Sequence, residues 1–487
     1  MATRKKETVP AASSNVIKGA EPYQPKMSAA TSKSIIKSEV GQRVKLSVYR
    51  STVTPLTPTE RELIIDQALA MLERTYAHLP LKRALHANDP IQSLKLLRLR
   101  HSALEERAFQ SAVMDVFLGL RDLHTNYILP NAYRSKFAFV PFRIEEFYEP
   151  GGVVPNPASP APQRSYVVSW VSPVNTVSTL KEGMVVTHWN GSPIDLAVAR
   201  NGAREAGSNL DARRAQGVEA LTLRWLGMSL PPDEDWVMLT YTDGTHAFES
   251  RFDWEINESS DRQSLLSGLS ALAASGKTPT PVGVDQKRML LDRVRKQVFD
   301  PQAVKVEDEM AKRLDKLGAK AMAEPLRAET SNFPDVFPRF GTVDTPSGKF
   351  GYIRLKSFAP ENHMGNVVWD TVNEFIRILK TLPPSGLILD VRGNGGGYIN
   401  IGELILQTLT PRDITPEGFH FLATSTTLAM ASKANNGIGE WKDSILEGLE
   451  SGASFSRGFP LTDPSDCNLI GQVYQGPVIL ITDALCY

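Results

Sequence analysis

Cysteine is nearly absent from this 487-residue sequence, which contains only Cys467 and Cys486. Two cysteines provide neither a disulfide framework nor a cysteine metal cluster, and such sparse use is typical of a reducing compartment. No apolar run approaches the roughly 20 residues of a transmembrane helix. The basic start, Arg4-Lys5-Lys6, has no apolar segment behind it, so we expect no secretory signal. These absences favour an intracellular protein that does not cross a membrane.

An excess of charge of either sign is also missing. Lys+Arg and Asp+Glu each number 54, so the formal net charge is zero. The sequence therefore gives no electrostatic reason to expect nucleic acid or an anionic membrane as a partner. The hydrophobic content of 41% is ordinary for a globular protein, and a chain of this length allows about three domains of roughly 150 residues each.

Several known catalytic and nucleotide-binding motifs are missing as well. The sequence has no H-E-x-x-H zinc motif and no G-x-S-x-G nucleophile elbow. A P-loop fails at Gly276-Lys277-Thr278, because Ala271 stands where its first glycine belongs. A dinucleotide fingerprint fails after Gly393 and Gly395, because Tyr398 replaces the third glycine. We therefore predict neither a metal nor a cofactor.

Composition and hydrophobic periodicity divide the chain into five parts. The first is rich in Ser, Ala, Pro and Lys and is predicted to be disordered. A segment dense in Pro and Gly, 151–163, indicates a linker or an exposed loop. The five parts are a disordered tail at 1–45, an N-terminal helical region at 46–150, a β-rich domain at 164–256, a charged helical insertion at 257–345 and an α/β core at 346–487.

Two helices are predicted in the N-terminal helical region. Thr57 and Glu60 form a capping box, with Pro58 at the first helical position. The apolar spacing of the helix that follows predicts an inward face made of Leu63, Ile64, Ala68, Met71 and Leu72. A second helix is predicted over 104–121, with an inward face made of Phe109, Val113, Val116 and Leu120.

Short strands and tight turns are predicted from residue 137 to residue 254. Asn190-Gly191 and Asp243-Gly244 each follow a β-rich run and are strong turn signals. A helical stretch at 197–226 interrupts the strands. The predicted strands are 137–140, 142–147, 166–171, 236–241 and 247–254.

Strands alternate with helices in the core, which predicts an α/β sheet with mostly parallel strands. Strands are expected at 350–355, 387–389 and 477–482, the last of them buried, whereas residues 437–465 are expected to be irregular and exposed. Apolar spacing marks two helices, the first by Val368, Val372, Phe375, Ile376 and Leu379, and the second by Ile401, Leu404, Ile405 and Leu409.

The stretch from Leu387 to Gly397 joins a core strand to a core helix through a turn with almost no side chains. Asp390 and Arg392 close the strand with charge, and four of the next five residues are glycine. Bare backbone N–H groups near a helix N-terminus can bind a negative charge. A close strand–helix turn without a ligand is the simpler alternative, but the string Asp-x-Arg-x-Asn-x-Gly-Gly is unusual.

That string resembles the carboxyl-terminal processing (tail-specific) serine peptidases, the superfamily that includes the tricorn core and chlamydial protease-like activity factor. The resemblance covers about residues 50–255 and 345–487. Besides the glycine stretch, it rests on 350–358 as the opening strand of the core, 120–125 as the Asp-x-His-Thr motif, 477–483 as the strand that leads to the nucleophile and, more loosely, 180–194 as the middle of a PDZ-like module.

The resemblance implies a ClpP/crotonase-like core, a PDZ-like domain and a serine-type endopeptidase that hydrolyses proteins or peptides through an acyl-enzyme. Gly395 or Gly396 would donate a backbone N–H to the oxyanion. His124 would be the general base. In other members a downstream lysine is the base, and His124 would then be a structural histidine near a helix end. Asp122 and Arg392 are interpreted as structural residues that fix their loops.

By the same resemblance, the serine nucleophile falls immediately after Tyr487, so we expect this chain to be a truncated and inactive form. Cys486 is interpreted as a small buried residue, since nothing nearby would lower the pKa of its thiol. The alternative is a non-catalytic peptide- or ligand-binding protein on the same fold, a class that includes interphotoreceptor retinoid-binding protein. The PDZ-like module would bind a peptide by strand addition or be purely structural.

Overall fold

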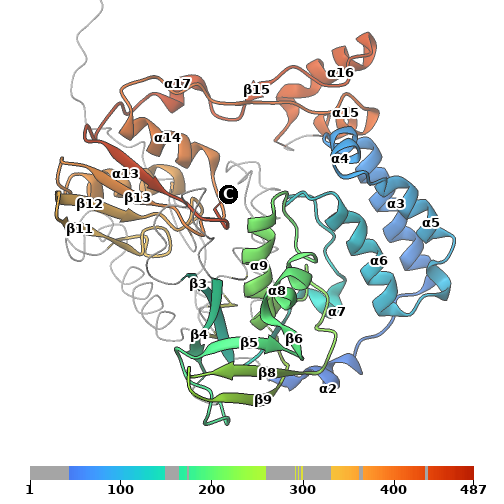
Figure 1. The fold of residues 1–487 in the computed structure, drawn as a ribbon. Coiled ribbons are helices and arrows are strands. Elements are labelled where there is room, and N and C mark those ends of the chain that lie inside the picture. Colours follow the sequence, from blue (N-terminus) through green and yellow to red (C-terminus); the bar gives the residue numbers. More distant parts are fainter. Residues whose placement is uncertain are drawn as a thin grey trace, which may run out of the picture.

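The structure is a computed structural model that describes several segments of the chain (Figure 1). These are residues 43–148, 164–172, 175–258, 331–360, 366–433 and 437–486, with a few helical residues (291, 294, 295, 298 and 299). The predicted linker, most of the predicted tail and most of the predicted insertion lie outside the described residues. Within the described residues, every helix is too short or too polar to cross a bilayer.

The N-terminal helical region packs its helices around one apolar cluster. Helix α3 (Pro58–Arg74) begins at the predicted capping box, in which Thr57 and Glu60 bond each other's backbone N–H groups. Helix α6 (Glu106–Gly119) buries Phe109, Val113 and Val116 as predicted, and the fourth predicted residue, Leu120, is buried at the C-cap of the helix. The elements between them are α4 (Leu79–His86), α5 (Pro90–Arg98) and the 3-10 helix η1 (His101–Ala103), which the sequence analysis did not predict.

The inward face predicted for α3 is partly wrong. Leu63 and Met71 are 56% and 55% exposed, and the buried face carries Ile65 and Leu69 instead. Arg61 lies on this buried face and forms an ion pair with Glu106 on α6, whose nearest atom is 2.9 Å away. A buried charge must face its partner, and the observed rotation of α3 allows this pair to form.

The β-rich part contains two sheets. In the first, of order β1-β10-β2-β7, the strands are β1 (Val44–Lys45), β10 (Glu255–Glu258), β2 (Lys136–Phe139) and β7 (Leu223–Trp225). The second, of order β3-β4-β5-β8-β9, consists of β3 (Phe142–Tyr148), β4 (Arg164–Val171), β5 (Val185–Trp189), β8 (Trp236–Thr242) and β9 (Ala247–Asp253), and β6 (Ser192–Pro193) pairs with β5. The short helices α2 (Leu46–Arg50) and α7 (Asn131–Arg134) precede β2.

Both predicted turns of this part are confirmed. Asn190 and Gly191 join β5 to β6 and have φ angles of 48° and 74°, the positive values that a two-residue hairpin turn requires. Gly244, with φ of 94°, lies in the turn of the antiparallel β8–β9 hairpin. The predicted helical stretch is two packed helices, α8 (Ile194–Gly202) and α9 (Leu210–Thr222).

The core is a mixed sheet of order β11-β12-β13-β16 with helices packed on it. Its strands are β11 (Arg339–Thr345), β12 (Gly348–Arg354), β13 (Leu387–Asp390) and β16 (Val478–Ile481). Strands β12, β13 and β16 are parallel, whereas β11 pairs antiparallel with β12, so the prediction of a mostly parallel α/β sheet holds. Because β11 is part of this sheet, the sheet starts before residue 346.

The apolar faces predicted for two core helices are confirmed at most positions. Helix α13 (Val367–Leu379) buries Val368, Val372, Phe375 and Leu379. Helix α14 (Ile399–Leu409) follows the glycine turn and buries Ile401, Leu404 and Ile405. Ile376 is only partly buried, whereas Ile378, which was not predicted for the inward face, is buried.

Two predictions about the last part of the core are wrong. Residues 437–465 form η3 (Gly439–Trp441), α16 (Lys442–Ser451) and the start of α17 (Pro464–Cys467), where Trp441 and Ile445 are buried in a cluster of their own. Of these, η3 and α16, with α15 (Ser425–Ala431), β14 (Gly418–Phe419) and β15 (Phe459–Pro460), form a lobe that reaches the N-terminal helices, whereas α17 lies beside α14 (Figure 1). The lobe contacts α3 through a 2.9 Å hydrogen bond from Thr424 to the Arg74 carbonyl.

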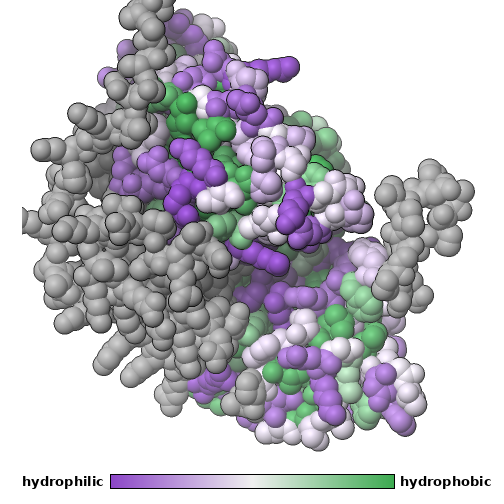
Figure 2. All heavy atoms as spheres, turned by 90° about the vertical axis from the view of Figure 1, so that its left-hand side faces the viewer, coloured by the Kyte–Doolittle hydropathy of each residue, from purple (hydrophilic) through white to green (hydrophobic). Residues whose placement is uncertain are grey.

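Strand β16 is also not buried as predicted. Ile479 and Leu480 are 64% and 57% exposed, because in the described part of the chain β16 is an edge strand that pairs only with β13. Figure 2 is seen from the side that lies at the left of Figure 1. It shows hydrophobic atoms at the height of the core sheet.

Candidate active site

The carboxyl ends of the three parallel core strands meet in one region, where the chain leaves each strand in an irregular loop. The Val391 N–H donates to the Ile481 carbonyl at 2.9 Å, which joins the loop after β13 to β16. The Phe358 N–H donates to the Gly396 carbonyl at 2.9 Å, and the Tyr398 N–H donates to the Phe358 carbonyl at 3.1 Å. Functional residues of parallel sheets gather at this edge.

Asp390 anchors the loop after β13. Its side chain is fully buried and accepts hydrogen bonds from the Tyr352 hydroxyl at 2.8 Å and the Arg392 guanidinium at 2.7 Å. Arg354 forms a third, very close contact with the same carboxylate. Burial alone would raise the pKa of Asp390, but the hydrogen bonds from Arg392 and Tyr352 and the charge of Arg354 hold this pKa far below its usual range. Asp390 is therefore ionised and fixed at neutral pH.

The glycine turn needs glycine for two physical reasons. Gly393 and Gly396 have φ angles of 65° and 84°, a region that side chains disfavour. At Gly397, whose φ is 151°, an added Cβ would lie 2.2 Å from the carbonyl carbon of Phe358. The turn therefore passes against the loop after β12 more closely than any side chain would allow.

The backbone N–H groups of the turn differ in what they bind. The Gly393 N–H donates to Asp483 Oδ1 at 2.8 Å, and the Gly396 N–H donates to Asn394 Oδ1 at 2.8 Å. The side-chain amide of Asn394 itself bonds the Leu355 carbonyl at 3.2 Å. Within the described residues, the Gly395 N–H has no hydrogen-bond acceptor. Of the two oxyanion donors left open by the sequence, Gly396 is engaged by a side chain and Gly395 is not.

Asp483 links the glycine turn to the turn after β16. Its Oδ1 accepts the Gly393 N–H at 2.8 Å and the Leu485 N–H at 3.0 Å. In the sequence Asp483 stands only at the end of a strand motif, which did not predict its place in the site. A carboxylate directly after a parallel strand was the available signal.

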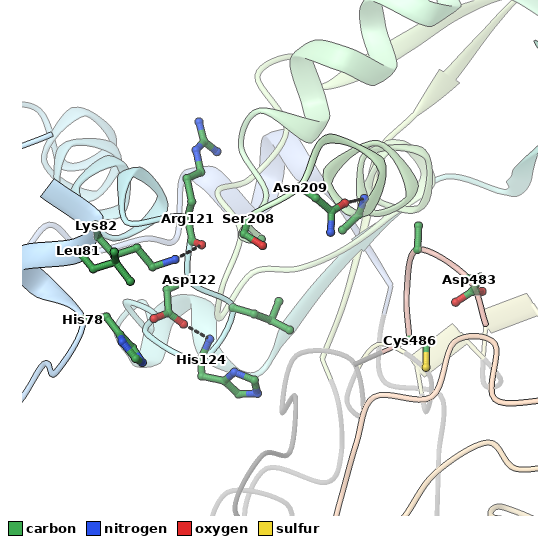
Figure 3. A pocket seen from close by; sticks show the side chains of 14 residues that line it. His78, Leu81, Lys82, Arg121, Asp122, His124, Ser208, Asn209, Asp483 and Cys486 are labelled. Atoms are coloured by element: carbon green, nitrogen blue, oxygen red, sulfur yellow. Dashed lines mark hydrogen bonds between the residues drawn. The ribbon is translucent and has the colours of Figure 1, made fainter. Parts of the chain in front are cut away.

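His124 lies on the loop that follows α6, and its side chain is exposed. Its backbone N–H donates to Asp122 Oδ1 at 2.9 Å, and Asp122 Oδ2 accepts the Tyr76 hydroxyl at 2.6 Å. Burial alone would raise the pKa of Asp122, but these two hydrogen bonds and the charge of Lys82 lower it. The ionised Asp122 carboxylate thus fixes the loop. The His124 ring points away from this carboxylate (Figure 3).

A pocket of about 410 Å³ brings His124 together with the end of β16. It lies between the start of α4, the loop after α6, the start of α9 with the loop before it, and the turn after β16, so four separate parts of the sequence form its walls. Figure 3 shows His124 on one wall, with Cys486 and Asp483 on the wall opposite. Gly395 and Gly396 do not line this pocket themselves, and Asp483 connects their loop to it.

Cys486 is a poor candidate for a nucleophile. Its pKa is raised by burial and by the neighbouring Asp483 carboxylate, which disfavours the reactive thiolate. The other cysteine, Cys467, is fully buried beside Glu403, and burial first and then Glu403 raise its pKa to about 12. Among the described residues, no group of three or more His, Cys, Asp and Glu side chains could hold a metal ion.

Comparison with known proteins identifies the core. Residues 349–487 match the model of peptidase family S41. No curated protein matches the chain. The core therefore belongs to peptidase family S41, as the resemblance to the tail-specific serine peptidases predicts.

Solved structures extend the likeness to most of the chain. Mature CPAF is 14% identical, with a TM-score of 0.52, over 87% of this chain and 78% of CPAF. Mature CPAF complexed with lactacystin gives 14% identity and a TM-score of 0.53 over 87% and 79% of the two chains. A CPAF mutant in which one serine is replaced by alanine gives the same identity and TM-score over 88% and 79%. At this identity the likeness shows the fold, a multidomain arrangement of helices and mixed α/β sheets.

Proposed function

We propose that this chain carries the framework of a serine-type endopeptidase that hydrolyses protein or peptide substrates through an acyl-enzyme. One observation carries the proposal: His124 and the turn after β16 line the same pocket, although they lie far apart in the sequence. In the family that the core resembles, the serine follows that turn. A base on the opposite wall is where a serine proton would be taken up.

Gly395 is the oxyanion donor that we favour. Its N–H is not engaged among the described residues, whereas the Gly396 N–H bonds Asn394. An oxyanion donor must be fixed before the charge develops. Asp390 holds the start of the turn, and Asp483 holds its Gly393 N–H against the turn after β16. In this proposal both carboxylates are positioning residues that do not touch the substrate.

The same proposal assigns the parts of the chain. The core would be ClpP/crotonase-like, and the sheet β3-β4-β5-β8-β9 with α8 and α9 would be the PDZ-like module. An edge of that sheet could accept a substrate segment by strand addition. The lobe around α16, which touches α3 through Thr424, would hold the core and the helical region in place around the pocket.

Labelling with a serine-reactive fluorophosphonate tests the proposal. We expect a form of the protein that includes the serine expected after Tyr487 to be labelled, and His124→Ala to slow labelling on the order of 100-fold or more because the general base is lost. His420→Ala is the matched control, since His420 bonds the Ser456 carbonyl in the lobe. Undiminished labelling of the His124 variant would remove His124 from the mechanism.

A non-catalytic peptide- or ligand-binding protein on the same fold is the second candidate. The observation in its favour is that, among the described residues, no carboxylate forms a hydrogen bond with the His124 ring, whereas the base of a triad is oriented by such a bond. Under this alternative, peptidase assays of the 487-residue chain stay at background. Turnover that Cys486→Ala abolishes would contradict both the alternative and our view of this thiol.

A further inference from the structure

The loop that carries His124 runs from one apolar cluster to another. It follows Leu120, which is buried in the cluster of the helical region, and it ends at Leu129, which is buried in the large cluster of the β-rich part. Tyr127 packs against both clusters, and the Leu129 N–H donates to the Gly227 carbonyl at 2.8 Å. No hydrogen bond within the described residues holds the His124 ring, so the backbone of the loop sets where that ring lies.

Two tyrosine hydroxyls hold this loop, one on each side of His124. Before His124, the Tyr76 hydroxyl donates to Asp122 Oδ2 at 2.6 Å, and Asp122 Oδ1 accepts the His124 N–H at 2.9 Å. After His124, the Tyr127 hydroxyl donates to Gln110 Oε1 at 2.8 Å. Burial is the largest cause that raises the pKa of both hydroxyls, so both remain protonated donors at neutral pH.

The hydrogen bond of Tyr127 leads into a buried polar network. Gln110 is fully buried on α6, and its Nε2 donates to Glu106 Oε1 at 2.7 Å. The other oxygen of Glu106 accepts the Arg61 guanidinium of α3 at 2.9 Å. A continuous chain of hydrogen bonds therefore runs from α3 through α6 to the loop, and it ends three residues after His124.

Apolar packing alone would not require this network. Burying polar and charged groups costs desolvation, and apolar side chains of similar size often stabilise a core equally well. The network adds a fixed position for Tyr127, whose ring otherwise only stacks on that of Phe117, with the centroids 6.2 Å apart. Position matters for a general base, because a displacement of about 1 Å can slow a reaction on the order of 100-fold.

We propose that Tyr76 and Tyr127 are positioning residues, which hold His124 in its place on the pocket wall through Asp122 and Gln110. The inference rests on the proposed function, because it takes His124 to be the general base. Neither tyrosine lines the pocket, so neither touches the substrate. Both act through the backbone of the loop between them.

Hydrogen exchange of the 487-residue chain tests whether the tyrosines hold the loop. Tyr127→Phe removes one hydroxyl and keeps the ring, and we expect the amides of residues 122–129 to exchange several-fold faster. Tyr474→Phe is the matched control, since it removes a 2.8 Å hydrogen bond to the Pro383 carbonyl in the core and should leave the loop unchanged. Tyr76→Phe should loosen the same loop from its other end, and it decides if the Tyr127 variant does not fold.

Fluorophosphonate labelling of the serine-containing form tests whether this hold serves His124. The rate per folded molecule should fall about tenfold or more in Tyr127→Phe, because the base is no longer held in place. Adding Gln110→Leu separates position from stability. With both partners apolar, neither the hydroxyl nor its acceptor is left unpaired, so the unfolding midpoint should return toward that of the original chain while labelling stays slow.

Three results would overturn the proposal: unchanged exchange of the loop in both tyrosine variants, an unchanged labelling rate per folded molecule, and labelling that recovers together with stability in the double variant. The outcome is separable from that of the proposed function. A serine-containing form that is not labelled, or that is labelled equally after His124→Ala, loses the peptidase assignment. The exchange rates of the 487-residue chain then still decide whether the two tyrosines hold the His124 loop.

Discussion

At the scale of single residues, the site depends on two buried or bridging carboxylates. Asp390 collects hydrogen bonds from Tyr352 and Arg392 at the end of β13, and Asp483 bridges two loops through one oxygen. The sequence indicated that Asp390 and Arg392 close a strand with charge. It could not indicate the bridge from Asp483 to Gly393, because that contact joins segments separated by the whole lobe around α16.

Replacing Asp390 by Asn should destabilise the protein by roughly 2–4 kcal/mol, because the substitution leaves two arginines beside a neutral side chain in a buried site. Urea unfolding at neutral pH measures the change. Asp344→Asn is the control: Asp344 is exposed and only 3.6 Å from the exposed Lys349, so the cost should be under about 0.5 kcal/mol. Equal costs for the two variants would contradict the anchoring role.

The Asp390 carboxylate should also make the free energy of unfolding depend on pH. The pKa of Asp390 is lower in the folded protein than in the unfolded chain, so its contribution is complete above the unfolded pKa of about 3.9. That contribution is lost as the pH falls below this value. The free energy of unfolding of Asp390→Asn should therefore fall less steeply than that of the original protein between about pH 5 and pH 3, in urea titrations at each pH.

At the scale of elements, local sequence signals predicted well wherever neighbours in the chain decide the structure. The capping box of α3 and the turns at Asn190-Gly191 and Gly244 are examples, because their hydrogen bonds and φ angles involve adjacent residues. The rotation of α3 was not predictable in this way. The buried face of α3 includes Arg61, whose partner, Glu106, belongs to another helix.

The glycine turn allows a matched test of close packing. Gly397→Ala would place a methyl group 2.2 Å from the Phe358 backbone, and we expect a loss of about 3 kcal/mol or more, since backbone cannot move aside cheaply. Gly402→Ala lies within α14, where the nearest atom is an ordinary 3.9 Å away, and should stabilise by about 0.5–1 kcal/mol. Thermal melts compare the two. A tolerated Gly397 variant would show that the turn can open.

At the scale of the whole molecule, the described chain leaves one strand of the core at an edge. Strand β16 exposes Val478, Ile479 and Leu480 and has an unpaired side in the described residues. Exposed apolar edge strands tend to pair with other chains. The sequence predicted this strand but placed it in the interior, because an apolar run alone does not tell an edge strand from a central one.

Ile479→Lys should therefore reduce self-association of the 487-residue chain. Light scattering during incubation at moderate temperature should fall several-fold, while the unfolding midpoint changes little, since Ile479 is 64% exposed. Leu469→Lys is the control, because Leu469 is exposed to a similar degree, 57%, but lies outside β16. Equal effects of both variants would mean that the edge strand is not the site of association.

The sequence by itself determined the class of the core. Its Asp-x-Arg-x-Asn-x-Gly-Gly string and alternating strands and helices predicted a mostly parallel α/β sheet and membership of the tail-specific peptidases. Only the tertiary structure decided how the site is assembled. The shared pocket of His124 and the β16 turn and the free Gly395 N–H among the described residues both depend on contacts between distant segments. Local patterns cannot encode such contacts, because the positions of those segments are set by the packing of the whole chain.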